Sequence, residues 1–170
     1  MRAFGLTFTL ALTLLAGPLA ASADPLRPPR AQGEFYPPQV NAVLGEARKA
    51  CRDAEGRKVT FQDGAVRRLD LTGHGRVDYV VDLSHATCDA AESLYCGTGG
   101  CELVILTKLP GGALTRVFEG RVLTHEVIPG AGAKRIRFRL HGSFCGKFGP
   151  EKCEKVRRID GRVFEFRQPK

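Results

Sequence analysis

The chain has 170 residues, six cysteines and a formal net charge of +8 at pH 7. This length is ample for one hydrophobic core and short for two, so we expect one folded domain. Beyond the N-terminal segment, no stretch approaches the roughly 20 consecutive apolar residues that a transmembrane helix needs. The sequence therefore predicts no transmembrane segment.

The N-terminal segment has the pattern of a secretory signal peptide. Met1-Arg2 gives a positive start, residues 4–15 are mostly apolar, and Ala21-Ser22-Ala23 places small residues where signal peptidase cuts. The apolar run is too short for a membrane anchor. We expect residues 1–23 to be a signal peptide that is cleaved after Ala23, which makes the mature protein periplasmic or secreted. Residues 24–38 hold five prolines and are expected to form an extended leader.

Residues 39–170 are expected to form a single α+β domain that is mainly β. Apolar residues recur at helical spacing between residues 39 and 54, which predicts one amphipathic helix packed on about eight antiparallel strands. The apolar positions of this helix are Val40, Val43, Leu44, Ala47 and Cys51.

After Gly56 the apolar period changes to two, which indicates strands. Strands are expected near residues 59–61, 65–71, 78–83, 102–109, 114–118, 121–128 and 134–141, with a loop at 84–100 that has room for one helical turn. The chain is expected to end in a hairpin of residues 156–159 and 162–166 around Asp160-Gly161, because Asp-Gly is a type I′ turn signal.

The cysteines are expected to form three disulfides, because an even number in an exported chain indicates a disulfide framework. No Cys-x-x-Cys pair is present, and the spacings do not fit a zinc finger or ribbon. Of the 15 possible connectivities, we expect the one that joins near neighbours, Cys96 with Cys101 and Cys145 with Cys153. This pairing leaves Cys51 to reach Cys88.

The stretch from Asp70 to Asp78 has the outline Asp-x-x-Gly-x-Gly-x-x-Asp and precedes an apolar strand. It resembles the calcium-binding turn of FG-GAP and VCBS-type repeats. By position, the resemblance implies a ligand set of Asp70, Thr72, His74, the Arg76 carbonyl and Asp78. Thr72 and His74 stand where the family has Asn or Asp, and a hydroxyl and an imidazole are poor calcium ligands.

Two accounts of this turn therefore stay open. We favour a structural turn in which Arg76 or the Thr72 hydroxyl bonds Asp70 or Asp78, with calcium as the one cofactor to test. A softer metal on His74 would need a further ligand such as His85. Together with the cysteines and Ile159-Asp160-Gly161-Arg162, the turn gives the chain a resemblance to a group of small, uncharacterised exported proteobacterial proteins. This resemblance supports an exported location and the expected fold, but it suggests no particular activity.

The sequence does not define an active site. Ser84-His85 and His141 near Ser143 are weak signals, because a nucleophile and its base also require an orienting acid and an oxyanion site. His125 is expected on the surface of a strand. We therefore expect a non-enzymatic exported binding or envelope-associated domain of unknown ligand. The alternatives are an envelope hydrolase whose acidic residues converge near residues 70–82, and an inhibitor of lysozyme-type enzymes.

The net positive charge of the chain indicates which kind of partner it would attract. Loss of Arg2 with the signal peptide lowers the net charge from +8 to +7, with basic clusters at residues 67–68, 134–137 and 155–158. Such a surface favours anionic envelope partners such as phospholipid headgroups, lipopolysaccharide or acidic glycans, or is simply a soluble basic surface. Nucleic acid is not expected for an exported protein. A positive charge also counts against the inhibitor alternative, because many lysozymes are themselves basic.

Overall fold

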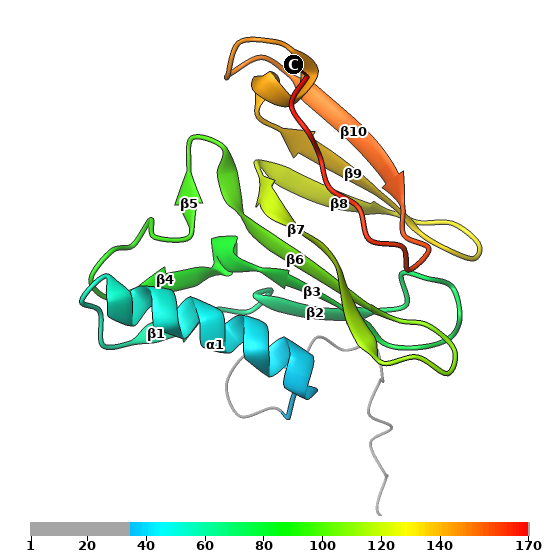
Figure 1. Ribbon diagram of the computed structural model, residues 1–170, viewed down its shortest axis with the longest axis horizontal. Coiled ribbons are helices and arrows are strands. Elements are labelled where there is room, and N and C mark those ends of the chain that lie inside the picture. The colour runs from blue at the N-terminus through cyan, green and yellow to red at the C-terminus, as the bar shows by residue number, and fades with distance from the viewer. Residues whose placement is uncertain (1–34, 170) are drawn as a thin grey trace, which may run out of the picture.

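The computed structural model describes residues 35–169. The predicted signal peptide 1–23 lies outside the described residues, as does the part of the leader before residue 35. Phe35 to Pro37 lead directly into the helix α1 (Pro38–Asp53), which is followed by ten strands (Figure 1). Every strand pair is antiparallel, as expected.

The strands form three sheets. A five-stranded sheet contains β2 (Val66–Leu69), β3 (Asp78–Asp82), β5 (Cys96–Gly97), β6 (Gly100–Lys108) and β7 (Leu114–Val122). A three-stranded sheet has the order β10 (Cys153–Arg158), β9 (Arg135–Leu140), β8 (Thr124–Ile128). The short strands β1 (Val59–Phe61) and β4 (Ala86–Cys88) pair with each other. Two 3-10 turns, η1 (Leu83–His85) and η2 (Gly142–Cys145), connect strands.

The five-stranded sheet is buried on both faces, which gives the domain three layers. Tyr79 and Val81 of β3 pack in the same core as α1, whereas Val80 between them packs in the core that the three-stranded sheet covers. Alternate residues of a strand point to opposite faces, so all five residues of β3 are buried. In Figure 1, α1 lies in the lower part of the view against the five-stranded sheet, and the three-stranded sheet lies above the five-stranded sheet.

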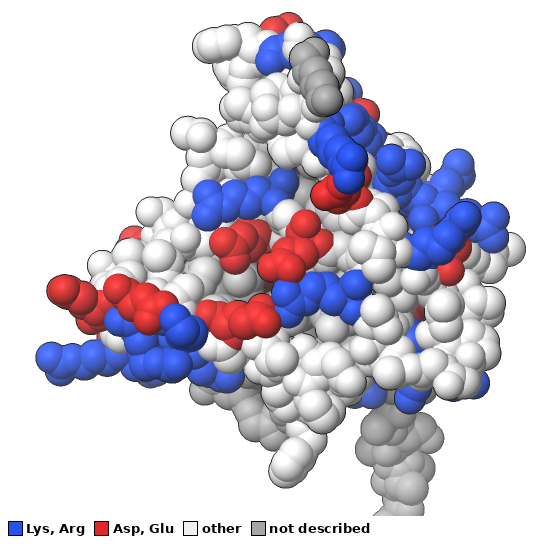
Figure 2. All heavy atoms as spheres, in the orientation of Figure 1, with Lys and Arg blue, Asp and Glu red and all other residues white. Residues whose placement is uncertain are grey.

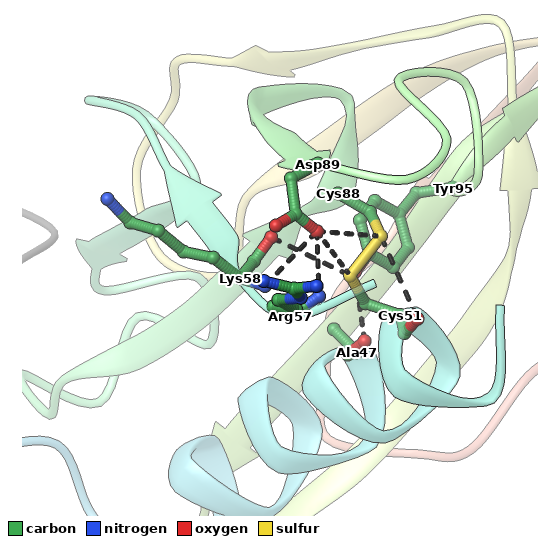
Figure 3. The surroundings of a disulfide bond; sticks show 7 residues. All are labelled: Ala47, Cys51, Arg57, Lys58, Cys88, Asp89 and Tyr95. Carbon is green, nitrogen blue, oxygen red and sulfur yellow. Dashed lines mark hydrogen bonds between the residues drawn. A yellow bond between two sulfur atoms is a disulfide. The ribbon is translucent and has the colours of Figure 1, made fainter. Parts of the chain in front are cut away.

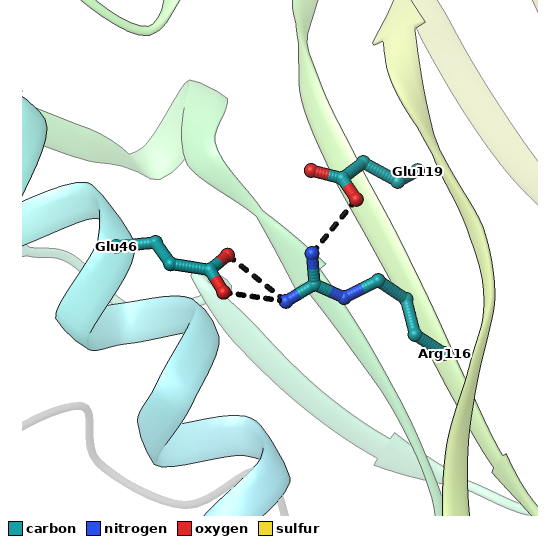
Figure 4. A network of polar contacts seen from close by, with 3 residues as sticks. All are labelled: Glu46, Arg116 and Glu119. Carbon is teal, nitrogen blue, oxygen red and sulfur yellow. Dashed lines mark hydrogen bonds and ion pairs between the residues drawn. The ribbon is translucent and has the colours of Figure 1, made fainter.

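The helix α1 confirms its predicted apolar face, since all five positions predicted for that face are buried. The disulfide Cys51–Cys88 ties its last turn to β4 (Figure 3). Gly56 lies against this bond, because a Cβ there would come within 2.4 Å of both sulfur atoms. At the middle of the helix, Glu46 binds Arg116 of β7, which also binds Glu119 (Figure 4).

The other two disulfides are Cys96–Cys101 and Cys145–Cys153, so all three pairs are the ones expected from the sequence. Asp89, which lies beside the Cys51–Cys88 disulfide, forms hydrogen bonds of its own. The Asp89 carboxylate accepts the backbone N–H groups of Lys58 and Arg57, and these hydrogen bonds lower its pKa. The bonds close the chain around Cys51 and Cys88 (Figure 3).

Two expectations about connections were wrong. Residues 84–100 are not a plain loop, because β4 and β5 form there and pair with β1 and β6. The predicted C-terminal hairpin is also absent from the described chain: β10 pairs with β9, and residues 159–169 run back across the three-stranded sheet (Figure 1). The reason is burial, because Phe164 and Phe166 pack their rings on Phe118 and Phe138.

Candidate functional site

The loop between β2 and β3 is built on its two predicted carboxylates. Asp70 accepts the backbone N–H groups of Gly73, His74 and Gly75 at 2.7, 3.2 and 2.8 Å. Gly73 and Gly75 have φ angles of 74° and 68°, a region that glycine adopts without strain. The loop therefore curls around the Asp70 side chain.

Asp78 is the buried acid of this region. One carboxylate oxygen accepts the N–H groups of Leu71 and Thr72 and the Thr72 hydroxyl, at 2.8, 2.9 and 3.1 Å. The other oxygen accepts the N–H of Lys108 at the end of β6, at 2.8 Å. Four donors thus satisfy a carboxylate that has no exposed surface, and they join the loop to the neighbouring strand.

The structure brings the predicted ligand set together only in part. The expected hydrogen bond between Thr72 and Asp78 is present. The side chain of Arg76 forms no ion pair with either acid, and His74 is exposed. Among residues 35–169, the group of three potential metal ligands that lie within 4.8 Å of one another is Cys51, Cys88 and Asp89, of which the two sulfurs form a disulfide.

A second acid, Asp82 at the end of β3, faces His125 of β8. The Nδ1 of His125 lies 3.6 Å from Oδ2 of Asp82, and the two side chains are 8% and 13% exposed. His125 is therefore not the surface residue that the strand pattern predicted. It is buried because β8 passes over the end of β3, a contact between residues 43 positions apart in the chain. A cavity of about 260 Å³ adjoins the pair, with Arg67, Ser84 and His85 in its wall.

Burial dominates the electrostatics of this pair. It lowers the pKa of His125, an effect that the negative charge of Asp82 opposes and that Arg67 and His85 reinforce. The Nε2 of His125 is buried and has no hydrogen-bond partner among the described residues. Asp82 accepts the N–H of Ser84 with its other oxygen, and no hydrogen bond joins the Ser84 hydroxyl to an imidazole in the described chain. The cavity thus holds an acid and a base without an activated nucleophile.

The other Ser–His pair of the sequence does form a hydrogen bond. The Nδ1 of His141 lies 2.8 Å from the Ser143 hydroxyl oxygen, and it also accepts the N–H of Ser143 at the start of η2. No acid in the described chain orients this imidazole. The pair therefore caps a turn.

The outer face of the three-stranded sheet gathers arginines. Arg135, Arg137 and Arg139 of β9 are exposed, whereas the residues that alternate with them are buried. The register places Arg158 of β10 directly opposite Arg135, and Val156, which is 48% exposed, opposite Arg137. We call Arg135, Arg137, Arg139 and Arg158 the basic face.

Two acids share this side of the sheet with the basic face. Glu126 of β8 binds Arg137, and Glu154 of β10 stands directly opposite Arg139 but binds Lys152. Arg135, Arg139 and Arg158 form no ion pair with another residue between 35 and 169. Figure 2 shows basic side chains over β10 and the C-terminal segment. There Lys155 and Arg157 lie over the ring of Phe166. The sequence showed the basic clusters, but only the strand register shows that four arginines share one face.

No family model, curated protein or solved structure matches this chain. The proposals below therefore rest on its own geometry.

Replacement of Asp78 by Asn should destabilise the protein by about 2–4 kcal/mol. The amide has only one acceptor oxygen, so its NH₂ group would face N–H donors that the second carboxylate oxygen now accepts. Asp70→Asn is the matched control. It should cost no more than about 1 kcal/mol, since Asn also caps exposed turns of this type. Urea denaturation measures both, and equal losses would contradict the buried role of Asp78.

Acidification should destabilise the fold through His125. Because the folded state lowers the pKa of His125, the unfolded chain takes up the proton first as the pH falls below the ordinary value of 6.5. The free energy of unfolding should therefore decline from about pH 6.5 downward. His125→Gln should flatten this decline, while His74→Gln, in the exposed loop, should leave it unchanged. A decline of the same slope in all three proteins would show that other groups cause it.

Proposed function

We propose that this protein is a non-enzymatic, envelope-associated binding domain that docks on an anionic surface through its basic face. The observation that carries the proposal is the pair Arg135 and Arg158, which stand directly opposite each other and form no ion pair with another described residue. Like charges in this position destabilise a sheet. A bound anion would remove that cost.

Arginine is the residue suited to such a partner. Its planar guanidinium forms two parallel hydrogen bonds to a phosphate. Residues two apart on one strand are separated by roughly 6.5–7 Å, so the three arginines of β9 present a row of such groups on one side of the sheet. Val156 adds an exposed apolar contact in the middle of the face. This chemistry fits the phosphates of anionic lipid headgroups.

The expected strength is that of a peripheral, salt-sensitive contact. A basic residue close to an anionic membrane surface contributes about 1 kcal/mol, and salt screens this attraction. Four arginines therefore support reversible docking.

The three disulfides are evidence about the cellular compartment of the protein. Three of them in one domain fit an extracellular or periplasmic protein. Together with the predicted signal peptide, they support the proposal of an exported domain. In the described part of the chain, no helix combines the length and apolar character needed to span a membrane.

We also propose that the loop 70–78 is a structural turn. Each of its carboxylates already accepts three or four hydrogen bonds, mostly from backbone N–H groups. A calcium ion would have to displace these donors, because N–H groups and the cation compete for the same oxygen lone pairs.

The hydrolase alternative is favoured by one observation, the cavity beside Asp82 and His125. In that site the Nε2 of His125 is buried, and neither hydroxyl-bearing residue of the wall, Ser84 or Thr124, is hydrogen-bonded to it. A base must reach the proton that it removes. The binding function therefore has the stronger support.

Loss of two arginines from the basic face should weaken vesicle binding. We expect Arg139→Gln with Arg158→Gln to reduce partitioning onto phosphatidylglycerol-containing vesicles by roughly 30-fold, from about 1 kcal/mol per arginine. Co-sedimentation at low salt measures this effect, and vesicles of phosphatidylcholine alone should bind neither protein.

The matched control is Arg52→Gln with Arg57→Gln, which removes the same charge from the end of α1 and the segment after it. It should retain most of the binding. Equal weakening by both double variants would mean that net charge alone drives binding, and the basic face would lose its role.

Excess calcium should leave the melting temperature unchanged relative to chelator. A ligand that binds the folded state alone stabilises it by about 2.7 kcal/mol at a hundredfold excess over its dissociation constant. A calcium-dependent rise that Asp70→Ala abolishes would restore the calcium interpretation of the turn.

A further inference from the structure

A larger cavity, of about 510 Å³, lies at the opposite end of β3 from His125. Its wall is formed by the start of α1, by Arg76 and Val77 at the end of the loop, and by the turn that connects β6 to β7. This volume falls within the range of about 300–1,000 Å³ that is typical of small-molecule sites.

The polar groups of this cavity are cationic or neutral. Arg76 and Lys108 line it, and neither forms an ion pair with a described residue. No acidic residue is in the wall. The carboxylate of Asp78 lies behind Lys108, but it is buried and accepts four hydrogen bonds from the chain. The cavity is therefore complementary to a negative charge.

Tyr79 adds a polar group to the wall. The residue is only 7% exposed and lines the cavity, and its hydroxyl forms no hydrogen bond with another residue of the described chain. The hydroxyl oxygen itself is accessible to solvent. It is therefore available to an anionic or hydroxyl oxygen of a ligand.

The rest of the wall is apolar. Val77, Leu114 and Pro37 present carbon surface beside the charged groups. A few polar groups that converge over an apolar wall are the usual composition of a site for an organic ligand. A free inorganic ion would leave that wall without a contact.

Asp78 binds the backbone near both cationic residues. One of its oxygens accepts the backbone N–H of Lys108, and the other accepts those of Leu71 and Thr72, at the start of the loop that contains Arg76. Both residues therefore start from a fixed backbone, which reduces the entropy that binding must cost.

We propose that this cavity binds a small organic anion, with its charged head on Arg76 and Lys108 and a short apolar body against Val77 and Leu114. The site is separate from the basic face, so each can fail without the other. In this proposal the turn 70–78, which resembles a cation-binding loop, contributes the positive side chain of Arg76 to an anion site.

The experiment is a titration of the ¹⁵N-labelled protein by NMR with three probes: hexanoate, hexanamide and inorganic phosphate. Hexanoate should shift the amide signals of Val77, Lys108 and Leu114 and reach saturation. Hexanamide has the same apolar body without the charge and should bind at least tenfold more weakly. Phosphate, which lacks the body, should also bind more weakly than hexanoate.

Two variants test the assignment. Arg76→Gln should weaken hexanoate binding by about tenfold or more, since it removes a charge-assisted hydrogen bond. Arg52→Gln, with the same loss of charge at the far end of α1, should leave the affinity unchanged. Both residues are exposed, so both variants should fold.

Three outcomes would overturn the proposal. Equal affinity for hexanoate and hexanamide would show an apolar groove without anion recognition. Phosphate that binds as tightly as hexanoate would show that the apolar wall contributes nothing. Equal affinity of the Arg76 and Arg52 variants would place the anion elsewhere.

Discussion

The rest of the structure depends on one buried charge, the carboxylate of Asp78. In a low-dielectric interior an ionised group is retained only if hydrogen bonds replace its lost hydration. Four donors do so here, from the loop before β3 and from the end of β6. This requirement fixes the loop relative to the central sheet. It also fixes the backbone of Lys108 and the start of the loop that contains Arg76, and these are the two cationic residues of the cavity that we assign to an anionic ligand.

The layered architecture explains where the polar groups can act. Because the five-stranded sheet is covered by α1 on one face and by the three-stranded sheet on the other, its strands have few exposed side chains. The sites that we propose therefore lie at an end of its strands and on the uncovered face of the outer sheet. The cavities beside Tyr79 and beside Asp82 lie at opposite ends of β3, and the basic face lies on the outer sheet.

Both proposed sites use positive charge, but they use it differently. On the basic face, Arg135 and Arg158 of adjacent strands stand opposite each other without an ion pair to a described acid, which suits an anionic surface and gives contacts that salt weakens. In the cavity, Arg76 and Lys108 stand beside carbon surface and a tyrosine that is almost fully buried, which suits one small molecule. A docked domain could thus bring its ligand cavity to a membrane surface.

The sequence by itself determined the elements whose causes are local in the chain. The apolar spacing of α1 predicted its buried face, the period of two predicted most strands, and short separations predicted two of the disulfides, which left the third. Only the tertiary structure decided what depends on distant contacts. The rings of Phe164 and Phe166 gain more by packing on Phe118 than a terminal hairpin would provide, and His125 is buried because β8 crosses the end of β3. The shared face of Arg135 and Arg158 likewise follows from strand register, which joins residues far apart in sequence and so leaves no local signal.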